Sequence, residues 1–285
     1  MKKRMGPKVN NGIGVIDSGV GGLTVVKEIM RQLPQETVYY FGDTARCPYG
    51  PRPSEEVRTF TLQMIAYLAR FQIKALVIAC NTATAVVLPE VMKLAPIPVI
   101  GVIDPGARTA IKETKTGIIG VIGTVGTIQS GAYEKALKRI NPHVEVYSYA
   151  CPKLVPLVES GIKDRQLALE IVRESLESFK GKPIDTLILG CTHYPLLADL
   201  IAEVMGEEVK LINSAEETAR ELSVVLDYRK QLAEQREDKS LHKFFVSGRS
   251  SVMKDIAGSI LQIPFEMQQA DVSQEKVCTI SWTKT

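Results

Sequence analysis

The sequence predicts an α/β protein of mostly parallel sheets flanked by helices, built from two matching halves. Short apolar runs alternate with helix-length segments, two sequence patterns recur in both halves, and 285 residues exceed one typical domain. The apolar runs lack a polar face, which is typical of parallel strands buried on both sides.

The expected strands are runs rich in β-branched residues. In chain order they cover residues 13–17, 38–43, 75–80, 99–104, 117–123, 144–151 and 185–191. Ligands of such sheets bind beyond the carboxyl ends of the strands. We therefore expect the chemistry among the residues that end these runs, which are Asp17, Ser18, Asp43, Cys80, Asn81, Asp104, Gly123, Thr124, Cys151, Cys191 and Thr192.

Two pairs of segments match between the halves. ALVIACNTAT (75–84) aligns with TLILGCTHYP (186–195), which places Cys80 opposite Cys191. GVIDSGVGG (14–22) likewise aligns with GVIGTVGTI (120–128). A further GVID begins at Gly101, which indicates that similar strand-turn sequences also arise without duplication. Internal duplication of the two halves is therefore a hypothesis.

The domain organisation is predicted to be discontinuous. Residues 11–105 plus 214–274 form a first lobe that carries Cys80, and residues 106–213 form a second lobe that carries Cys191. The segment after Asn213 is helical and charged, and is followed by a strand-like run at 243–248 and a helix near 251–261. We expect this tail to complete the first sheet, with the final dozen residues frayed.

Composition excludes several classes of function. The net charge of +3 is spread along the chain, which predicts no nucleic-acid footprint. No run reaches the roughly 18 apolar residues of a membrane span, and no apolar stretch follows the basic first ten residues as an export signal requires. Five cysteines, an odd number, favour free thiols over a disulfide framework. These features predict a soluble cytoplasmic protein.

Cys80 and Cys191 are the strongest candidates for chemistry. Each follows an apolar strand and precedes residues suited to a helix N-terminus, a setting that lowers a thiol pKa. His193 stands two residues after Cys191 and can exchange a proton with it. A single buried cysteine is usually a small hydrophobe, but a matched pair suits inversion of a stereocentre. One thiolate removes the α-proton while the opposing thiol delivers another.

Turn residues near the strand ends are weaker candidates. Asp17 could accept a proton or orient a substrate ammonium group, or could simply cap the next helix. The loop 43–52 can offer backbone N–H groups to a carboxylate, although a plain turn explains it equally well. Thr124 and Thr127 occupy the corresponding turn of the other half.

Ordered motifs make the chain resemble the glutamate racemases. They are IGVIDSGVGGLTV (13–25), FGDTARCPYG (41–50), CNTAT (80–84), LVESG (157–161) and GCTHYPLL (190–197). The resemblance implies two lobes with the active site between them, no cofactor and no metal. It also implies D-glutamate supply for peptidoglycan, and often a homodimer.

The same resemblance assigns roles to individual residues. Cys80 and Cys191 are the implied catalytic bases, with Asp17 assisting Cys80, His193 assisting Cys191 and Glu159 near the second cysteine. The implied substrate contacts are Asp17, Ser18, Tyr49, Gly50, Asn81, Thr82, Thr127, Thr192 and His193.

Other functions fit parts of the sequence. Gly19, Gly21 and Asp43 have the spacing of a nicotinamide-binding turn, but Thr24 stands where that fingerprint needs Gly or Ala. Aspartate racemisation shares the two-thiol chemistry, and a hydrolase could use Cys191 with one histidine. A regulatory role on DNA gyrase, described for some glutamate racemases, has no basic or aromatic signature here.

A zinc site is not expected. The sequence has three histidines and no close cluster of cysteines and histidines that would suit zinc; the histidines are His143, His193 and His242. The remaining three cysteines are assigned structural roles. Of these, Cys47 lies in the loop 43–52 and could approach the site between the lobes. The others are Cys151 and Cys278.

Overall fold

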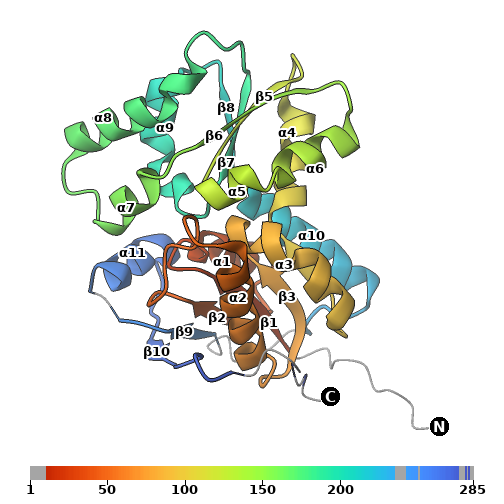
Figure 1. Cartoon of the computed structure of the whole chain (residues 1–285). Coiled ribbons are helices and arrows are strands. Elements are labelled where there is room, and N and C mark those ends of the chain that lie inside the picture. Colours follow the sequence, from red (N-terminus) through yellow and green to blue (C-terminus); the bar gives the residue numbers. More distant parts are fainter. Residues whose placement is uncertain (1–10, 235–241, 250, 276–279, 281, 283–285) are drawn as a thin grey trace.

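Two parallel sheets, each covered by helices on both faces, form the two lobes of the protein (Figure 1). The computed structural model describes residues 11–234, 242–249, 251–275, 280 and 282. The first ten residues, Cys278 and most of the final dozen residues lie outside this part. The predicted α/β class with two parallel sheets is confirmed.

The first sheet has six parallel strands in the order β10-β9-β2-β1-β3-β4. Their bounds are β1 Gly12–Asp17, β2 Val38–Gly42, β3 Ile73–Ile78, β4 Val99–Gly101, β9 Lys243–Val246 and β10 Met267–Gln269. Val15 and Ile16 are fully buried in opposite faces, because successive strand residues point to opposite sides.

Two groups of helices cover the first sheet. On one face lie α1 (Leu23–Gln32), α10 (Ser214–Tyr228) and α11 (Ser251–Leu261). On the other lie α2 (Ser54–Leu68) and α3 (Asn81–Leu94). The tail after Asn213 thus returns to the first sheet, as expected, although α10 ends earlier than the charged pattern suggested.

The second sheet has four parallel strands in the order β6-β5-β7-β8. Their bounds are β5 Ile118–Gly123, β6 Glu145–Ala150, β7 Thr186–Gly190 and β8 Lys210–Ile212. One face packs against α4 (Ile103–Glu113) and α6 (Ala132–Ile140). The other packs against α7 (Leu154–Glu159), α8 (Arg165–Leu176) and α9 (Ala198–Met205). Short helical segments complete the lobe: α5 Val125–Gln129, η1 Glu177–Phe179 and η2 Tyr194–Leu197.

The run 99–104 differs from its prediction. Only Val99–Gly101 is strand, and Asp104 lies in the first turn of α4, where it pairs with Arg139 on the surface. Pro105 explains the early start, since its fixed φ suits the first turn of a helix. Asp104 is therefore not a strand-end residue. Strands β8 and β10 were not predicted because each has only three residues.

The two lobes repeat one topology. The order β2-β1-β3-β4 in the first sheet corresponds to β6-β5-β7-β8 in the second. In each sheet the second strand lies on one side of the first strand, and the third strand lies on its other side. This change of direction creates a topological switch point between β1 and β3 and between β5 and β7. Such switch points form the crevices where open α/β sheets bind ligands. The first crevice holds Asp17 and Cys80, and the second holds Cys191.

Candidate active site

Cys80 and Cys191 line one cavity between the lobes. The cavity measures only about 10 Å³, which is about the space that a single water needs. Its walls come from both lobes and consist of Ser18, Pro48, Tyr49, Gly50, Cys80, Asn81, Thr82, Thr124, Val155, Cys191, Thr192 and His193. The structure is therefore closed around the two thiols.

Cys80 caps the N-terminus of α3. The Ala83 N–H donates to its Sγ at 3.5 Å, and the thiol reaches the Ser18 hydroxyl at 3.6 Å. The predicted position at a helix N-terminus is correct, but the predicted pKa is wrong. Burial, followed by the charge of Asp17, raises the pKa of Cys80 to about 12, and the two hydrogen bonds only reduce that rise.

Cys191 belongs to a chain of polar contacts that ends at Glu159. His193 Nδ1 lies 3.8 Å from Cys191 Sγ, and its Nε2 lies 3.1 Å from Glu159 Oε1. Burial acts to lower the pKa of His193, but the contacts with Cys191 and Glu159 outweigh it and raise that pKa to about 10. Burial likewise opposes ionisation of Glu159, yet hydrogen bonds from His193 and Cys47 keep the pKa of Glu159 below its ordinary value. His193 is thus held as an imidazolium beside Cys191.

Asp17 joins the two lobes beneath the cavity. Its carboxylate is fully buried, accepts the Gly19 N–H at 2.9 Å and accepts the Thr192 hydroxyl at 3.1 Å. Burial raises the pKa of Asp17, while the charge of His193 and these hydrogen bonds lower it. Asp17 therefore places an acidic group whose charge acts on Cys80 and on His193.

Hydroxyl and amide groups link the lobes at the other side of the cavity. Thr82 Oγ1 lies 2.9 Å from Thr124 Oγ1 and 3.1 Å from Thr127 Oγ1. The Gly126 N–H donates to the Gly50 carbonyl at 2.9 Å. The Tyr133 hydroxyl, from the second lobe, donates to Asn81 Oδ1 at 2.7 Å. These bonds hold the closed arrangement.

The loop 43–52 is anchored by a buried carboxylate. Asp43 accepts hydrogen bonds from the Tyr49 hydroxyl, from Arg46 Nε at 2.7 Å and from the Ser247 hydroxyl at 2.7 Å. The Tyr49 hydroxyl thus points to Asp43, so Tyr49 borders the cavity with its ring and backbone. The fixed loop presents Gly50 to the site.

Most of the expected site residues gather at this cavity. Asp17, Glu159 and Thr127 do not line the closed cavity, and each of them contacts a residue that does. Sequence reasoning missed Val155 and Pro48 as lining residues, and no chemical signal marks an apolar side chain as a wall. It also missed the contact between the Cys47 thiol and Glu159 Oε1 at 2.9 Å.

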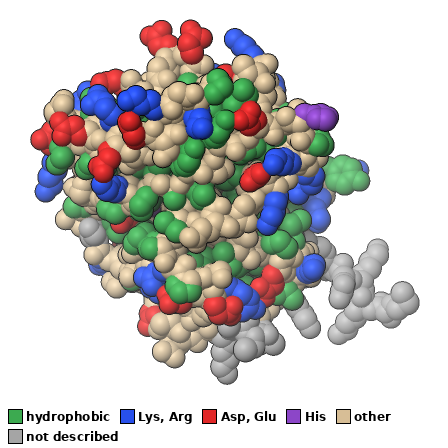
Figure 2. Space-filling model, turned by 45° about the horizontal axis from the view of Figure 1, so that its top comes forward, with side chains coloured by type: hydrophobic (Ala, Val, Ile, Leu, Met, Phe, Trp, Pro, Cys, Tyr) green, Lys and Arg blue, Asp and Glu red, His purple; other side chains and the backbone are tan. Residues whose placement is uncertain are grey.

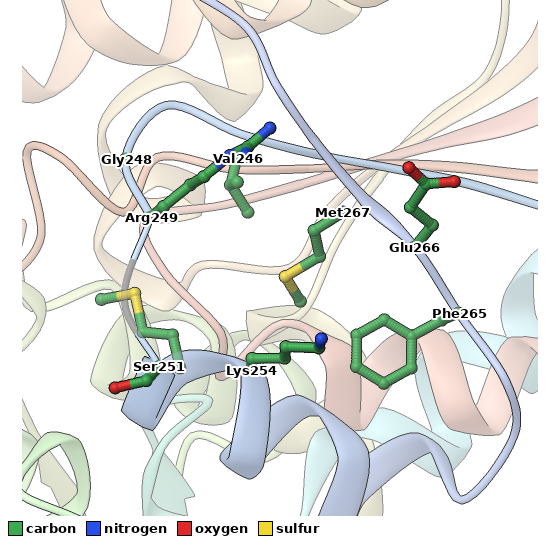
Figure 3. Close-up of a pocket in the computed structure, with 9 residues that line it drawn as sticks. Val246, Gly248, Arg249, Ser251, Lys254, Phe265, Glu266 and Met267 are labelled. Atoms are coloured by element: carbon green, nitrogen blue, oxygen red, sulfur yellow. The ribbon is translucent and has the colours of Figure 1, made fainter.

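A larger cavity lies elsewhere in the first lobe. It measures about 380 Å³ between β9, β10 and α11, and Figure 3 shows Arg249, Lys254 and Glu266 among apolar side chains such as Phe265. None of its lining residues is a cysteine or a histidine. Size alone would not select the cavity at the thiols, because a further cavity of about 760 Å³ lies in the second lobe beside Asp185. The switch points and the two thiols select the smaller one.

The surface carries charge of both signs. On the face that Figure 2 shows, Lys and Arg side chains are interspersed with Asp and Glu. Among the described residues, no helix combines the length and apolar character needed to cross a membrane.

Fold and site together define a two-lobed α/β protein with a thiol from each lobe at one closed cavity. The profile of the Asp/Glu/hydantoin racemase family matches residues 13–222, and the chain belongs to this family. A glutamate racemase of Bacillus cereus is 57% identical over 91% of this chain and 96% of its own length.

Two solved structures of glutamate racemases are also similar to this chain over most of its length. A glutamate racemase isoform of Bacillus anthracis matches with a TM-score of 0.87 at 50% identity, covering 92% of this chain and 97% of that one. A glutamate racemase of Francisella tularensis, solved with D-glutamate, matches with a TM-score of 0.86 at 35% identity, covering 93% of this chain and 99% of that one.

Proposed function

We propose that this chain is a glutamate racemase that moves the α-proton of glutamate between Cys80 and Cys191. The observation that carries the proposal is that equivalent thiols, after β3 and β7, line one cavity from opposite lobes. Inversion of a stereocentre needs an acid and a base on opposite faces of the carbon, and this arrangement supplies both.

The reaction balances through the two sulfurs. One cysteine, as thiolate, takes the α-proton, and the electron pair of the broken C–H bond is left on the carbon and delocalised into the carboxylate. The other cysteine, as thiol, gives its proton to the opposite face. After one turnover the protonation states of Cys80 and Cys191 are exchanged, and turnover from the other enantiomer restores them. The protein groups carry the proton themselves, so the mechanism needs no cofactor.

Neighbouring groups support a role for each of the two cysteines. The charge of the buried Asp17 acts on Cys80, and we assign Asp17 to accept the proton of Cys80 or to attract the substrate ammonium group. The His193 imidazolium, held by Glu159, can give a proton to Cys191 or stabilise its thiolate. Both thiols therefore have a partner that tunes their protonation.

The cavity walls suit an amino acid with two carboxylates. Ser18, Asn81, Thr82 and Thr192 offer hydroxyl and amide groups, and Gly50 offers its backbone in the loop 43–52. We assign substrate contacts to these residues and to Tyr49, Thr127, His193 and Asp17. Because the closed cavity is far smaller than an amino acid, the lobes must separate to admit substrate and close again to exclude water.

Similarity favours glutamate over aspartate. The relatives at more than half identity are glutamate racemases, whereas an aspartate racemase of Picrophilus torridus shares only 19% identity. We propose that the product serves peptidoglycan synthesis in the cytoplasm, where both thiols stay reduced.

We also propose a homodimer. Val224 and Tyr228 stand one helical turn apart on α10 and are 63% and 88% exposed, which leaves an apolar stripe for a second copy. Light scattering on the purified chain measures the mass and decides the point.

The test is racemisation in deuterated water. We expect L-glutamate to lose its optical rotation and gain α-deuterium without added cofactor. Cys80→Ser and Cys191→Ser should each lower the racemisation rate by about 10²- to 10⁴-fold, the contribution of a general acid or base. Cys151→Ser is the matched control, because Cys151 is a buried thiol that contacts two backbone carbonyls. Full turnover in either active-site variant would contradict the two-thiol mechanism and favour a single-thiol reaction.

A further inference from the structure

Three metal-ligating side chains meet at the rim of the site. Cys47 Sγ, Glu159 Oε1 and His193 Nε2 all lie within 4.8 Å of one another. The sulfur is 2.9 Å and the imidazole nitrogen 3.1 Å from the same carboxylate oxygen. The sequence did not predict the cluster, because Cys47 and Glu159 are 112 residues apart and come from different lobes.

The cluster has room and an entrance. It packs over Gly19, where an ideal Cβ would lie 3.0 Å from Cys47 Sγ and 3.5 Å from Glu159 Oε1, so the missing side chain leaves space for the three groups. Cys47 and Glu159 are partly exposed, whereas His193 is buried. Two of the three residues therefore border solvent.

The donor set selects the kind of ion. One thiolate, one imidazole and one carboxylate suit Zn²⁺ in tetrahedral coordination, whereas Mg²⁺ and Ca²⁺ require oxygen ligands. Three protein ligands leave the fourth position to water. We propose that Cys47, Glu159 and His193 form a Zn²⁺ site that inhibits the enzyme when occupied.

Binding exchanges protons for the metal. Zn²⁺ takes the place of the Cys47 thiol proton and of the proton on His193 Nε2, and both protons leave to solvent. Because two protons are exchanged for one divalent cation, the net charge of the cluster does not change. Ligand atoms about 2.0–2.3 Å from zinc must sit slightly farther apart than these hydrogen bonds hold them, so small side-chain shifts accompany binding.

Inhibition follows from the position of His193 and rests on the proposed racemase function. Its Nε2 would hold the metal while its Nδ1 faces Cys191. The metal would fix this ring and, because Cys47 and Glu159 come from different lobes, would tie the lobes together so that they cannot separate to admit substrate. The Cys80 side keeps its own contacts with Ser18 and Ala83.

The first measurement is binding of Co²⁺ as a spectroscopic probe, which needs no activity. The wild type should show a thiolate-to-cobalt charge-transfer band and the absorption of tetrahedral Co²⁺, and Zn²⁺ should displace both. Cys47→Ser should remove the thiolate band and weaken Zn²⁺ binding by more than the roughly 10- to 100-fold that loss of an outer-shell partner causes. Glu159→Gln is a second ligand variant, and Cys151→Ser is the matched thiol control that should bind as the wild type does.

The second measurement is Zn²⁺ inhibition of each variant relative to its own metal-free rate. The inhibition constant should rise in Cys47→Ser and stay unchanged in Cys151→Ser. Equal inhibition of Cys47→Ser and wild type would place the metal on the catalytic thiols and overturn the proposal, as would a thiolate band that survives in Cys47→Ser. A chain that binds Co²⁺ as expected but does not racemise glutamate would refute the proposed function and leave the metal site standing.

Discussion

Removing the negative charge of Glu159 tests how the second thiol is controlled. Glu159→Gln keeps the shape of the side chain and a hydrogen-bonding oxygen but deletes the charge 3.1 Å from His193 Nε2. At an effective dielectric constant of about 20, a charge pair at this distance is worth at most about 5 kcal/mol. Partial exposure of Glu159 reduces that ceiling to an effect of about 1–3 pKa units.

The variant should therefore lower the pKa of His193 from about 10 to between about 7 and 9. The raised pKa stabilises the fold fully below the ordinary histidine pKa, and this contribution is lost as pH rises through the folded pKa. In Glu159→Gln this stabilisation should be smaller and its loss should be complete at a lower pH than in the wild type. The fall of racemase activity on the alkaline side should likewise begin at lower pH.

Imidazole NMR measures this pKa directly, because the chain has only three histidines. Comparison with His193→Gln assigns the signal of His193. Glu170→Gln, an exposed charge change on α8, is the control and should leave the titration unchanged. A His193 titration that is the same in Glu159→Gln and wild type would refute the idea that Glu159 holds the imidazolium.

Two further predictions concern buried charges outside the cavity. Lys74→Met leaves Glu36 buried without its ammonium partner at 2.7 Å, so the free energy of unfolding measured in urea should fall by about 3–5 kcal/mol. The control Lys138→Met breaks an exposed ion pair and should lower it by less than about 1 kcal/mol. Asp43→Asn weakens the hydrogen bond that anchors Tyr49 in the loop 43–52. Steady-state kinetics should show KM rising by about tenfold, equivalent to about 1.4 kcal/mol, with a smaller change in kcat. An unchanged KM would show that the loop keeps its shape without the charge.

The sequence by itself determined the α/β class, the matched position of Cys80 and Cys191, and the return of the tail to the first sheet. These features follow from local patterns, because apolar runs define parallel strands and because strand ends in both halves carry the same residue type. Local patterns did not predict β8 and β10, because three residues are too few to form a recognisable strand pattern.

Only the tertiary structure decided the electrostatics and the partners. A helix N-terminus suggested a low pKa for Cys80, but burial and Asp17 raise it, and neither effect is visible in the local sequence. The contact of Glu159 with His193 joins residues 34 apart within the second lobe. Its contact with Cys47 joins residues 112 apart and exists because the loop 43–52 and α7 come from different lobes. Local sequence patterns reach only a few residues along the chain, whereas desolvation and charge act through space.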